Sequence, residues 1–84
     1  MSPVTIYTKN WCGYCTRAKA LLARKGADVT EIEISDDAAS RDEMVERSGG
    51  RRTVPQIFIG ETHVGGCDDL YRLEGEGRLD ALLA

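Results

Sequence analysis

The chain has 84 residues, of which 30% are charged, and a formal net charge of −3. This length supports one hydrophobic core, so we expect a single domain over residues 1–84. The acidic balance argues against a general nucleic-acid binder, because no basic stripe is present to neutralise phosphates. No apolar run approaches the ~20 residues that span a bilayer, and the first residues lack the pattern of a secretory signal.

The sequence contains three cysteines, an odd number and well below the density of a disulfide-rich scaffold. This cysteine usage favours a reducing, cytoplasmic setting. In such a setting, a C-x-x-C pair is more often catalytic or metal-binding than a permanent crosslink.

The first third of the chain predicts a strand followed by a helix. Residues 4–7 alternate and are β-branched or aromatic, which is typical of a short strand. Across residues 14–22, apolar side chains recur at the spacing of one buried helical face. Gly26 is then expected to end this helix.

The middle of the chain repeats this order. Residues 29–34 alternate again and have one polar face, so we expect an outer strand of the sheet. Residues 35–37 (Ser-Asp-Asp) offer N-cap oxygens for a helix that runs to about Ser48 and ends at the Gly-Gly pair after it.

The last third predicts a hairpin and two helices. Residues 56–59 (Gln-Ile-Phe-Ile) are a mainly apolar run, consistent with a strand buried on both faces, and residues 62–64 supply the second arm of a hairpin. Asp68 is a candidate cap for the helix that follows. Residues 79–83 predict a last short helix.

Together these elements predict an α/β fold with a four-stranded mixed sheet flanked by helices. The order is strand, helix, strand, helix, strand, strand, helix (βαβαββα), before the last short helix. The first strand–helix–strand unit should give parallel neighbours through a right-handed crossover. A C-x-x-C pair beside such a unit is typical of a thioredoxin-like fold.

The segment NWCGYCTR (residues 10–17) places two thiols, Cys12 and Cys15, where the first strand gives way to its helix. On a helix, residues three apart lie roughly 5–6 Å from each other, within the range that a disulfide tolerates. Cys12 would sit near the N-cap, where unpaired N–H groups and the helix dipole favour a negative charge, and Lys9 would add a positive field. Cys15, one turn into the helix, should be more buried. We therefore predict that Cys12 attacks and Cys15 resolves.

Two other interpretations of the thiols stay open. Cys12, Cys15, His63 and Cys67 supply four possible zinc ligands of the Cys₃His type. The regular α/β pattern between the two halves of this set argues against zinc, because zinc modules of this size usually fold on the metal. A permanent structural disulfide is disfavoured by the inferred reducing compartment.

Three segments carry a family resemblance: IYTKNWCGYC (residues 6–15), TVPQIFIG (residues 53–60) and GGCDDL (residues 65–70). In this order and at this spacing, they resemble the dithiol glutaredoxins of the thioredoxin-like superfamily, and the small bacterial type in particular. The resemblance covers nearly the whole chain. It implies a glutathione-dependent disulfide oxidoreductase, with Cys12 and Cys15 catalytic, that acts on glutathionylated or disulfide-containing proteins. We expect a monomer, with no nucleic-acid or membrane partner.

The same resemblance implies a glutathione site. It predicts a cis peptide before Pro55, which would bring the backbone N–H and C=O of Val54 beside Cys12. The γ-glutamyl end of glutathione would meet the Cys67 backbone and the Asp68 side chain. The glycine carboxylate would face Lys9 and one of two neighbouring arginines, Arg51 or Arg52. The expected glutathione-binding residues are Lys9, Tyr14, Arg52, Thr53, Val54, Pro55, Gly66, Cys67 and Asp68.

Several of these residues also have purely structural interpretations. Pro55 could simply begin a strand, and Tyr14 could pack in the helix's apolar stripe. Asp69 could serve only as a helix cap. The Cys67 thiol is expected to be a bystander, and His63 to be a solvent-facing strand residue and not a base.

Gly13 departs from the commonest form of the family, which has proline at this position. Some relatives with a small residue there bind a [2Fe-2S] cluster between two subunits, each of which supplies its first cysteine and a glutathione. The alternative hypothesis is therefore a cluster-bridged dimer that acts as a carrier or sensor, with Cys12 as the ligand. A thioredoxin, reduced by a flavoprotein, is a third hypothesis, which Tyr14, the short chain and the GGCDDL segment oppose.

Overall fold

The computed structural model describes residues 1–84 and contains one mixed four-stranded sheet. Its strands are β1 (Val4–Thr8), β2 (Val29–Glu33), β3 (Gln56–Ile59) and β4 (Thr62–Gly65), in the spatial order β2-β1-β3-β4. β1 and β2 run parallel, whereas β1 pairs with β3 and β3 with β4 in antiparallel fashion. The predicted mixed sheet, with its parallel first pair and its hairpin, is confirmed.

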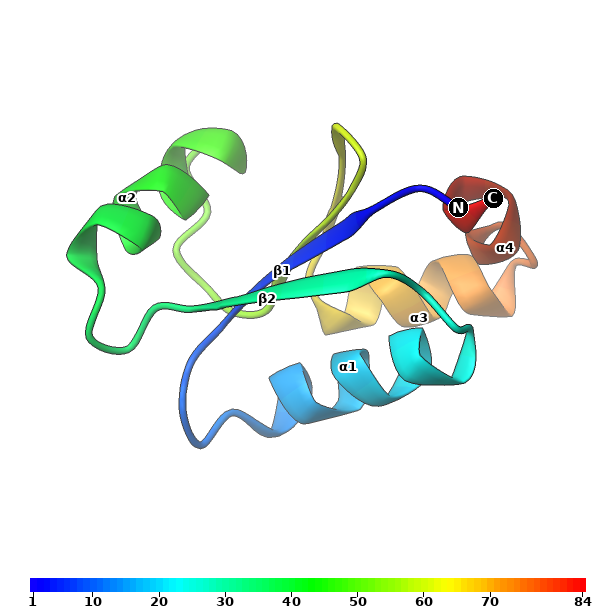
Figure 1. Cartoon of the computed structure of the whole chain (residues 1–84), viewed down its shortest axis with the longest axis horizontal. Helices are drawn as coiled ribbons and strands as arrows, with labels where there is room; N and C mark the ends of the chain where they lie inside the picture. The colour runs from blue at the N-terminus through cyan, green and yellow to red at the C-terminus, as the bar shows by residue number, and fades with distance from the viewer.

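Four helices cover the sheet: α1 (Gly13–Arg24), α2 (Ala38–Arg47), α3 (Cys67–Gly75) and α4 (Leu79–Leu83). α1 and α3 lie side by side on one face, and α2 lies on the other (Figure 1). The predicted order βαβαββα is confirmed, with α4 as the last short helix. The chain ends meet beside α4, where the Ser2 N–H donates to the Leu83 carbonyl at 2.9 Å. No helix has the length and apolar character that crossing a membrane requires.

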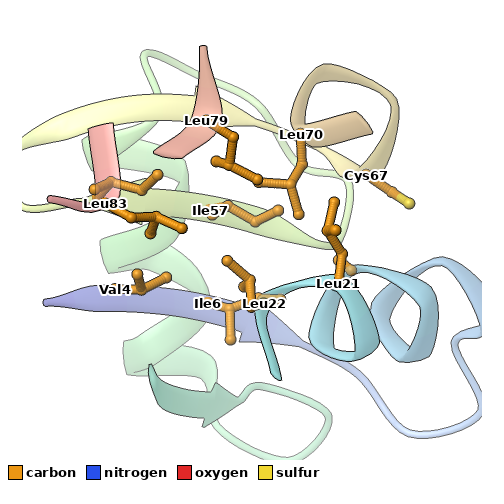
Figure 2. Close-up of a cluster of buried hydrophobic side chains, with 11 residues drawn as sticks. Val4, Ile6, Leu21, Leu22, Ile57, Cys67, Leu70, Leu79 and Leu83 are labelled. Atoms are coloured by element: carbon orange, nitrogen blue, oxygen red, sulfur yellow. The ribbon is translucent and has the colours of Figure 1, made fainter. Parts of the chain in front are cut away.

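The larger core lies between the sheet and the helices α1, α3 and α4 (Figure 2). Alternate residues of β1 and β3 point into it, and β3 is buried on both faces, as its apolar run predicts. The buried members of this core are Val4, Ile6, Ala18, Leu21, Leu22, Ile57, Ile59, Cys67, Leu70, Leu79 and Leu83. A smaller cluster of Tyr7, Ile34, Met44 and Phe58 lies on the other face, toward α2.

β2 lies at the edge of the sheet, as its alternation predicts, but its polar face is not simply open to water. Val29, on that face, packs against the larger core. Glu31 accepts hydrogen bonds from the Thr8 hydroxyl at 2.6 Å and from the Lys19 ammonium of α1 at 3.0 Å. These two bonds, the Thr8 bond first, lower the pKa of Glu31 below its ordinary value. The polar face therefore joins β2 to β1 and α1.

The helix ends are set by local chemistry. Asp37 caps α2 by accepting the Ser40 N–H at 3.0 Å, and Gly26, at φ +67°, follows the end of α1. The prediction that Asp68 caps α3 is wrong. The N-cap is Gly66, two residues earlier, and Asp68 lies within the first turn of the helix.

Candidate active site

Cys12 is the N-cap residue of α1. Its backbone is extended (φ −108°, ψ 105°), and its Sγ accepts the backbone N–H of Cys15 at 3.1 Å. The Cys12 carbonyl accepts the Thr16 N–H, also at 3.1 Å, so the residue is held from both sides. The sulfur therefore receives one of the N–H groups that a helix start leaves without an intrahelical partner.

Cys15 differs from Cys12 in its surroundings. Its side chain is buried, with 2% of the residue exposed, whereas Cys12 is only partly covered. Burial, followed by the hydrogen bond with Cys12, raises the pKa of Cys15 to about 12. At neutral pH Cys15 is therefore a thiol.

The loop before Cys12 carries a fully exposed aromatic side chain. Trp11 has φ +58°, a left-handed conformation that L-residues other than glycine adopt at a cost of order 1 kcal/mol or more. The loop is anchored by the Asn10 N–H, which donates to the Ser35 hydroxyl at 2.9 Å. A hollow of about 410 Å³ opens here, lined by Lys9, Asn10, Trp11, Cys12, Gly13, Cys15, Thr16, Lys19, Glu31 and Glu33.

A second hollow, of about 400 Å³, lies between the start of α1, the loop before β3 and the start of α3. The peptide bond between Val54 and Pro55, on its wall, is cis. The Val54 N–H and C=O take part in no backbone hydrogen bond, so both are available to a ligand. The hollow is lined by Tyr14, Arg51, Thr53, Val54, Pro55, Gly66, Cys67, Asp68, Asp69 and Arg72.

Most residues predicted to bind glutathione meet at this second hollow. Two do not: Lys9 lines the hollow of Cys12 and Trp11, and Arg52 lines neither. Arg51, the alternative to Arg52, does line it. Tyr14 is exposed there and does not join the core, so it is free to contact a ligand.

Asp69 organises the start of α3. Its Oδ2 accepts the Gly66 N–H at 2.8 Å and lies 3.6 Å from Nη1 of Arg51, and its Oδ1 lies 3.6 Å from Nη1 of Arg72. Gly65 has φ +115°, and a Cβ on it would overlap the Asp69 carboxylate. Asp69 therefore caps the start of α3, as one of its two interpretations predicts. Sequence reasoning missed Arg72, although its position three residues after Asp69 on one helix indicates a shared face.

Cys67 lies at the boundary between the second hollow and the larger core. Only 4% of the residue is exposed, and its sulfur points away from the centre of the leucine cluster (Figure 2). Burial raises the pKa of Cys67, and the neighbouring Asp68 and Cys12 act in the same direction. Cys67 therefore stays protonated at neutral pH.

The four side chains considered as zinc ligands do not converge. His63 stacks on Phe58, with ring centroids 4.9 Å apart, and its Nε2 lies 2.8 Å from Oε1 of Gln56. No group of three or more histidine, cysteine, aspartate or glutamate side chains is arranged to hold a metal ion. The prediction that His63 faces solvent is wrong, because the ring is half-buried by its packing on Phe58.

Known proteins are similar to this chain over nearly its whole length. Residues 4–64 match the family model described as Glutaredoxin. The chain is 60% identical over 84 residues to a glutaredoxin of Pseudomonas aeruginosa, covering 100% of this chain and 99% of that protein. The solution structure of glutaredoxin from Brucella melitensis has 65% identity and a TM-score of 0.85, covering 99% of this chain and 89% of that one. The crystal structure of a buckwheat glutaredoxin–glutathione complex has 35% identity and a TM-score of 0.86, covering 98% of this chain and 76% of that one.

Proposed function

Because the chain belongs to the glutaredoxin family of thiol–disulfide oxidoreductases, we propose that it draws its electrons from glutathione. Its substrates are mixed disulfides between glutathione and proteins, and disulfides within proteins. We expect it to work in the cytoplasm, as a monomer. The reduction potentials of glutaredoxins, about −200 to −230 mV, lie close to the poise of the glutathione pool, so the reaction can run in either direction.

The observation that carries this proposal is the position of the Cys12 sulfur. A thiolate accepts a hydrogen bond more strongly than a thiol does, and the positive end of the helix dipole stabilises its charge. The 3.1 Å bond from the Cys15 N–H to Sγ of Cys12 therefore places at this sulfur the kind of donor that an attacking thiolate needs. Cys15, buried and protonated, does not compete with it.

In the one-thiol reaction, the Cys12 thiolate attacks the glutathione sulfur of a mixed disulfide. The bond between the two sulfurs of the substrate breaks, the protein partner leaves as a thiolate that takes a proton from water, and Cys12 becomes glutathionylated. The thiolate of a second glutathione then attacks the bound glutathione sulfur. Oxidised glutathione leaves, and the Cys12 thiolate is restored.

With a protein disulfide, the Cys12 thiolate attacks one protein sulfur, the S–S bond breaks and the other protein sulfur leaves as a thiolate. Cys15 then attacks Sγ of Cys12. Part of the raised Cys15 pKa comes from the hydrogen bond and the charge of Cys12. Both contributions disappear once Cys12 is in a disulfide, so Cys15 loses its proton more readily at the step that needs its thiolate. The protein sulfur bound to Cys12 leaves as a thiolate and the Cys12–Cys15 disulfide forms. Two glutathione molecules then reduce this disulfide and leave as oxidised glutathione.

We place glutathione in the second hollow. Its backbone would pair with the free N–H and C=O of Val54, as a strand pairs with a sheet edge. Its γ-glutamyl carboxylate would face the N–H groups at the start of α3, close to Asp68. Arg51 and, from the adjoining hollow, Lys9 supply positive charge for the glycine carboxylate. The buckwheat glutaredoxin, with 35% identity, was crystallised as a glutathione complex, which supports glutathione as the ligand.

The test is glutathione-dependent turnover of a small glutathione mixed disulfide and of a protein disulfide. We expect Cys12→Ser to be inactive on both. Cys15→Ser should keep the first reaction and lose most of the second, and Cys67→Ser is the matched control that should keep both. Full activity of Cys12→Ser, or turnover that does not need glutathione, would refute the proposal.

A second candidate function is [2Fe-2S] binding between two copies of the chain. A side chain added at Gly13 would meet nothing within 4 Å, so there is open space next to Cys12. A cluster needs four thiolates, which two protomers would supply as one Cys12 and one glutathione each. An anaerobic preparation tests it: visible absorbance with dimeric elution supports it, and a colourless monomer opposes it. Gly13→Pro, compatible with the first helical position, is the matched variant that should lose the cluster.

A further inference from the structure

A chain of hydrogen-bonded polar side chains, with buried Gln56 between half-buried His63 and exposed Thr53, runs from β4 to the wall of the second hollow. Gln56, on β3, has no exposed surface. Its Nε2 donates to the Thr53 carbonyl at 3.0 Å and to the Thr53 hydroxyl at 3.2 Å. Its Oε1 faces Nε2 of His63 at 2.8 Å. The Thr53 end of this chain lies immediately before Val54 and lines the hollow.

The hydrogen-bond pattern assigns the protons along this chain. Both amide hydrogens of Gln56 are directed to Thr53, so its oxygen is left as an acceptor. His63 must then donate through Nε2–H, because a bare Nε2 would face the Gln56 oxygen with no proton between them. Burial and, after it, the charge of Arg51 lower the pKa of His63, so the neutral imidazole is favoured. The hydrogen bond to Gln56 then places its proton on Nε2.

His63 is itself held by packing. Its ring stacks on Phe58 at an interplanar angle of 26°, and the Arg47 guanidinium lies 4.2 Å from the centre of the Phe58 ring. Phe58 also meets the Tyr7 ring edge-on, with centroids 5.8 Å apart. The imidazole is therefore fixed by the smaller core, and it fixes the orientation of the Gln56 amide in turn.

We propose that His63 and Gln56 are a positioning pair that holds Thr53 and thereby aims the Val54 N–H and C=O at glutathione. This inference rests on the proposed function for its ligand. Neither residue takes part in the chemistry. Neither lines the second hollow, and the pair acts only through the Thr53 backbone and hydroxyl. Losing the His63 donor leaves the buried Gln56 oxygen unpaired, which removes the restraint on the amide and on Thr53.

His63→Phe is the primary test, because it keeps an aromatic ring on Phe58 and removes only the donor. We expect the KM for a small glutathione mixed disulfide to rise about fivefold, the scale of one net hydrogen bond, with kcat nearly unchanged. His63→Gln places an amide N–H near the position of Nε2 and should restore most of the KM. Thr62→Ala, on the same strand but exposed, is the control that should change nothing.

The pathway through Gln56 is tested by a double-variant cycle. If His63 acts through Gln56, the double variant His63→Phe/Gln56→Leu should have the KM of Gln56→Leu alone. Additive effects would overturn the proposal. So would an unchanged KM in His63→Phe, or a loss of kcat in proportion to lost thermal stability, because those results indicate a general packing role.

A measurement without glutathione separates this inference from the proposed function. In the free protein, His63→Phe should shift the amide NMR signals of Thr53 and Val54 more than Thr62→Ala does, and the wild-type imidazole should show an Nε2–H tautomer. Unchanged Val54 signals would refute the positioning role. Failure of the wild-type protein to use glutathione would instead refute the proposed function, while the amide signals still decide whether the pair holds Val54.

Discussion

Sγ of Cys12 and the backbone N–H of Cys15 are joined by a 3.1 Å hydrogen bond, so the Cys12 sulfur caps the N-terminus of α1. The proposed nucleophile therefore also stabilises the helix. Reactivity and folding are coupled at this atom, and the two can be separated by the choice of substitution.

Cys12→Ala and Cys12→Ser should differ in stability but not in activity. Serine keeps an N-cap oxygen, whereas alanine removes the acceptor at a cost of about 1 kcal/mol in the free energy of unfolding. Both variants lack the nucleophile, so both should be inactive. Urea denaturation measures the difference when both variants are fitted with one m-value, the dependence of the unfolding free energy on urea concentration. Equal stability of the two variants would mean that the sulfur does not cap α1.

The stability of the protein should fall in alkaline solution because of Cys15. The folded state raises the pKa of Cys15 from 9.0 to about 12, so the folded state keeps a proton that the unfolded chain loses first. The contribution of this thiol is complete below about pH 9 and is lost as the pH rises toward 12, by up to about 1.4 kcal/mol per pH unit. Cys15→Ala should have a flatter profile than wild type between these limits when unfolding is followed by circular dichroism. A profile that is equally steep without Cys15 would assign the loss to other groups.

Asp69→Ala should destabilise the start of α3. It removes the acceptor of the Gly66 N–H and the shared partner of Arg51 and Arg72, and we expect a loss of about 1 kcal/mol. Asp69→Asn keeps an oxygen for the Gly66 N–H and should recover most of it. Thermal unfolding monitors both variants. If Asp69→Asn were as unstable as Asp69→Ala, the charge pairs and not the cap would hold this helix start.

Arg51→Gln and Arg52→Gln should affect glutathione use differently. Arg51 lines the second hollow, and its Nη1 lies 3.6 Å from Oδ2 of Asp69, whereas Arg52 lines neither hollow. We expect Arg51→Gln to raise the KM for a glutathione mixed disulfide about threefold to fivefold, the scale of one exposed charge pair, and Arg52→Gln to leave it unchanged. The difference should shrink at high salt. A larger effect at Arg52 would return the role to the residue first expected from the sequence.

Local patterns predicted the fold and the thiol pair because each depends on residues close in sequence. The apolar run of β3 indicates burial on both faces, and the C-x-x-C spacing at a helix start indicates an N-cap sulfur. The choice between Arg51 and Arg52 could not be made in this way, since the two neighbours occupy one loop and only the packed structure orients them.

The positioning pair was also beyond sequence reasoning. His63 reaches Gln56 across a hairpin whose register shifts between Ile57 and Phe58, and such an irregularity has no clear signature in the chain. The same limit applies to the polar face of β2, where alternation indicates an edge strand but not the Lys19 partner that Glu31 finds on α1.

The most direct measurement of the central claim is the mass of Cys15→Ser after reaction with oxidised glutathione at neutral pH. With its resolving thiol removed, the protein should carry one glutathione, located on Cys12, and reduced glutathione should remove it. Absence of an adduct, or an adduct on Cys67 in place of Cys12, would contradict the account.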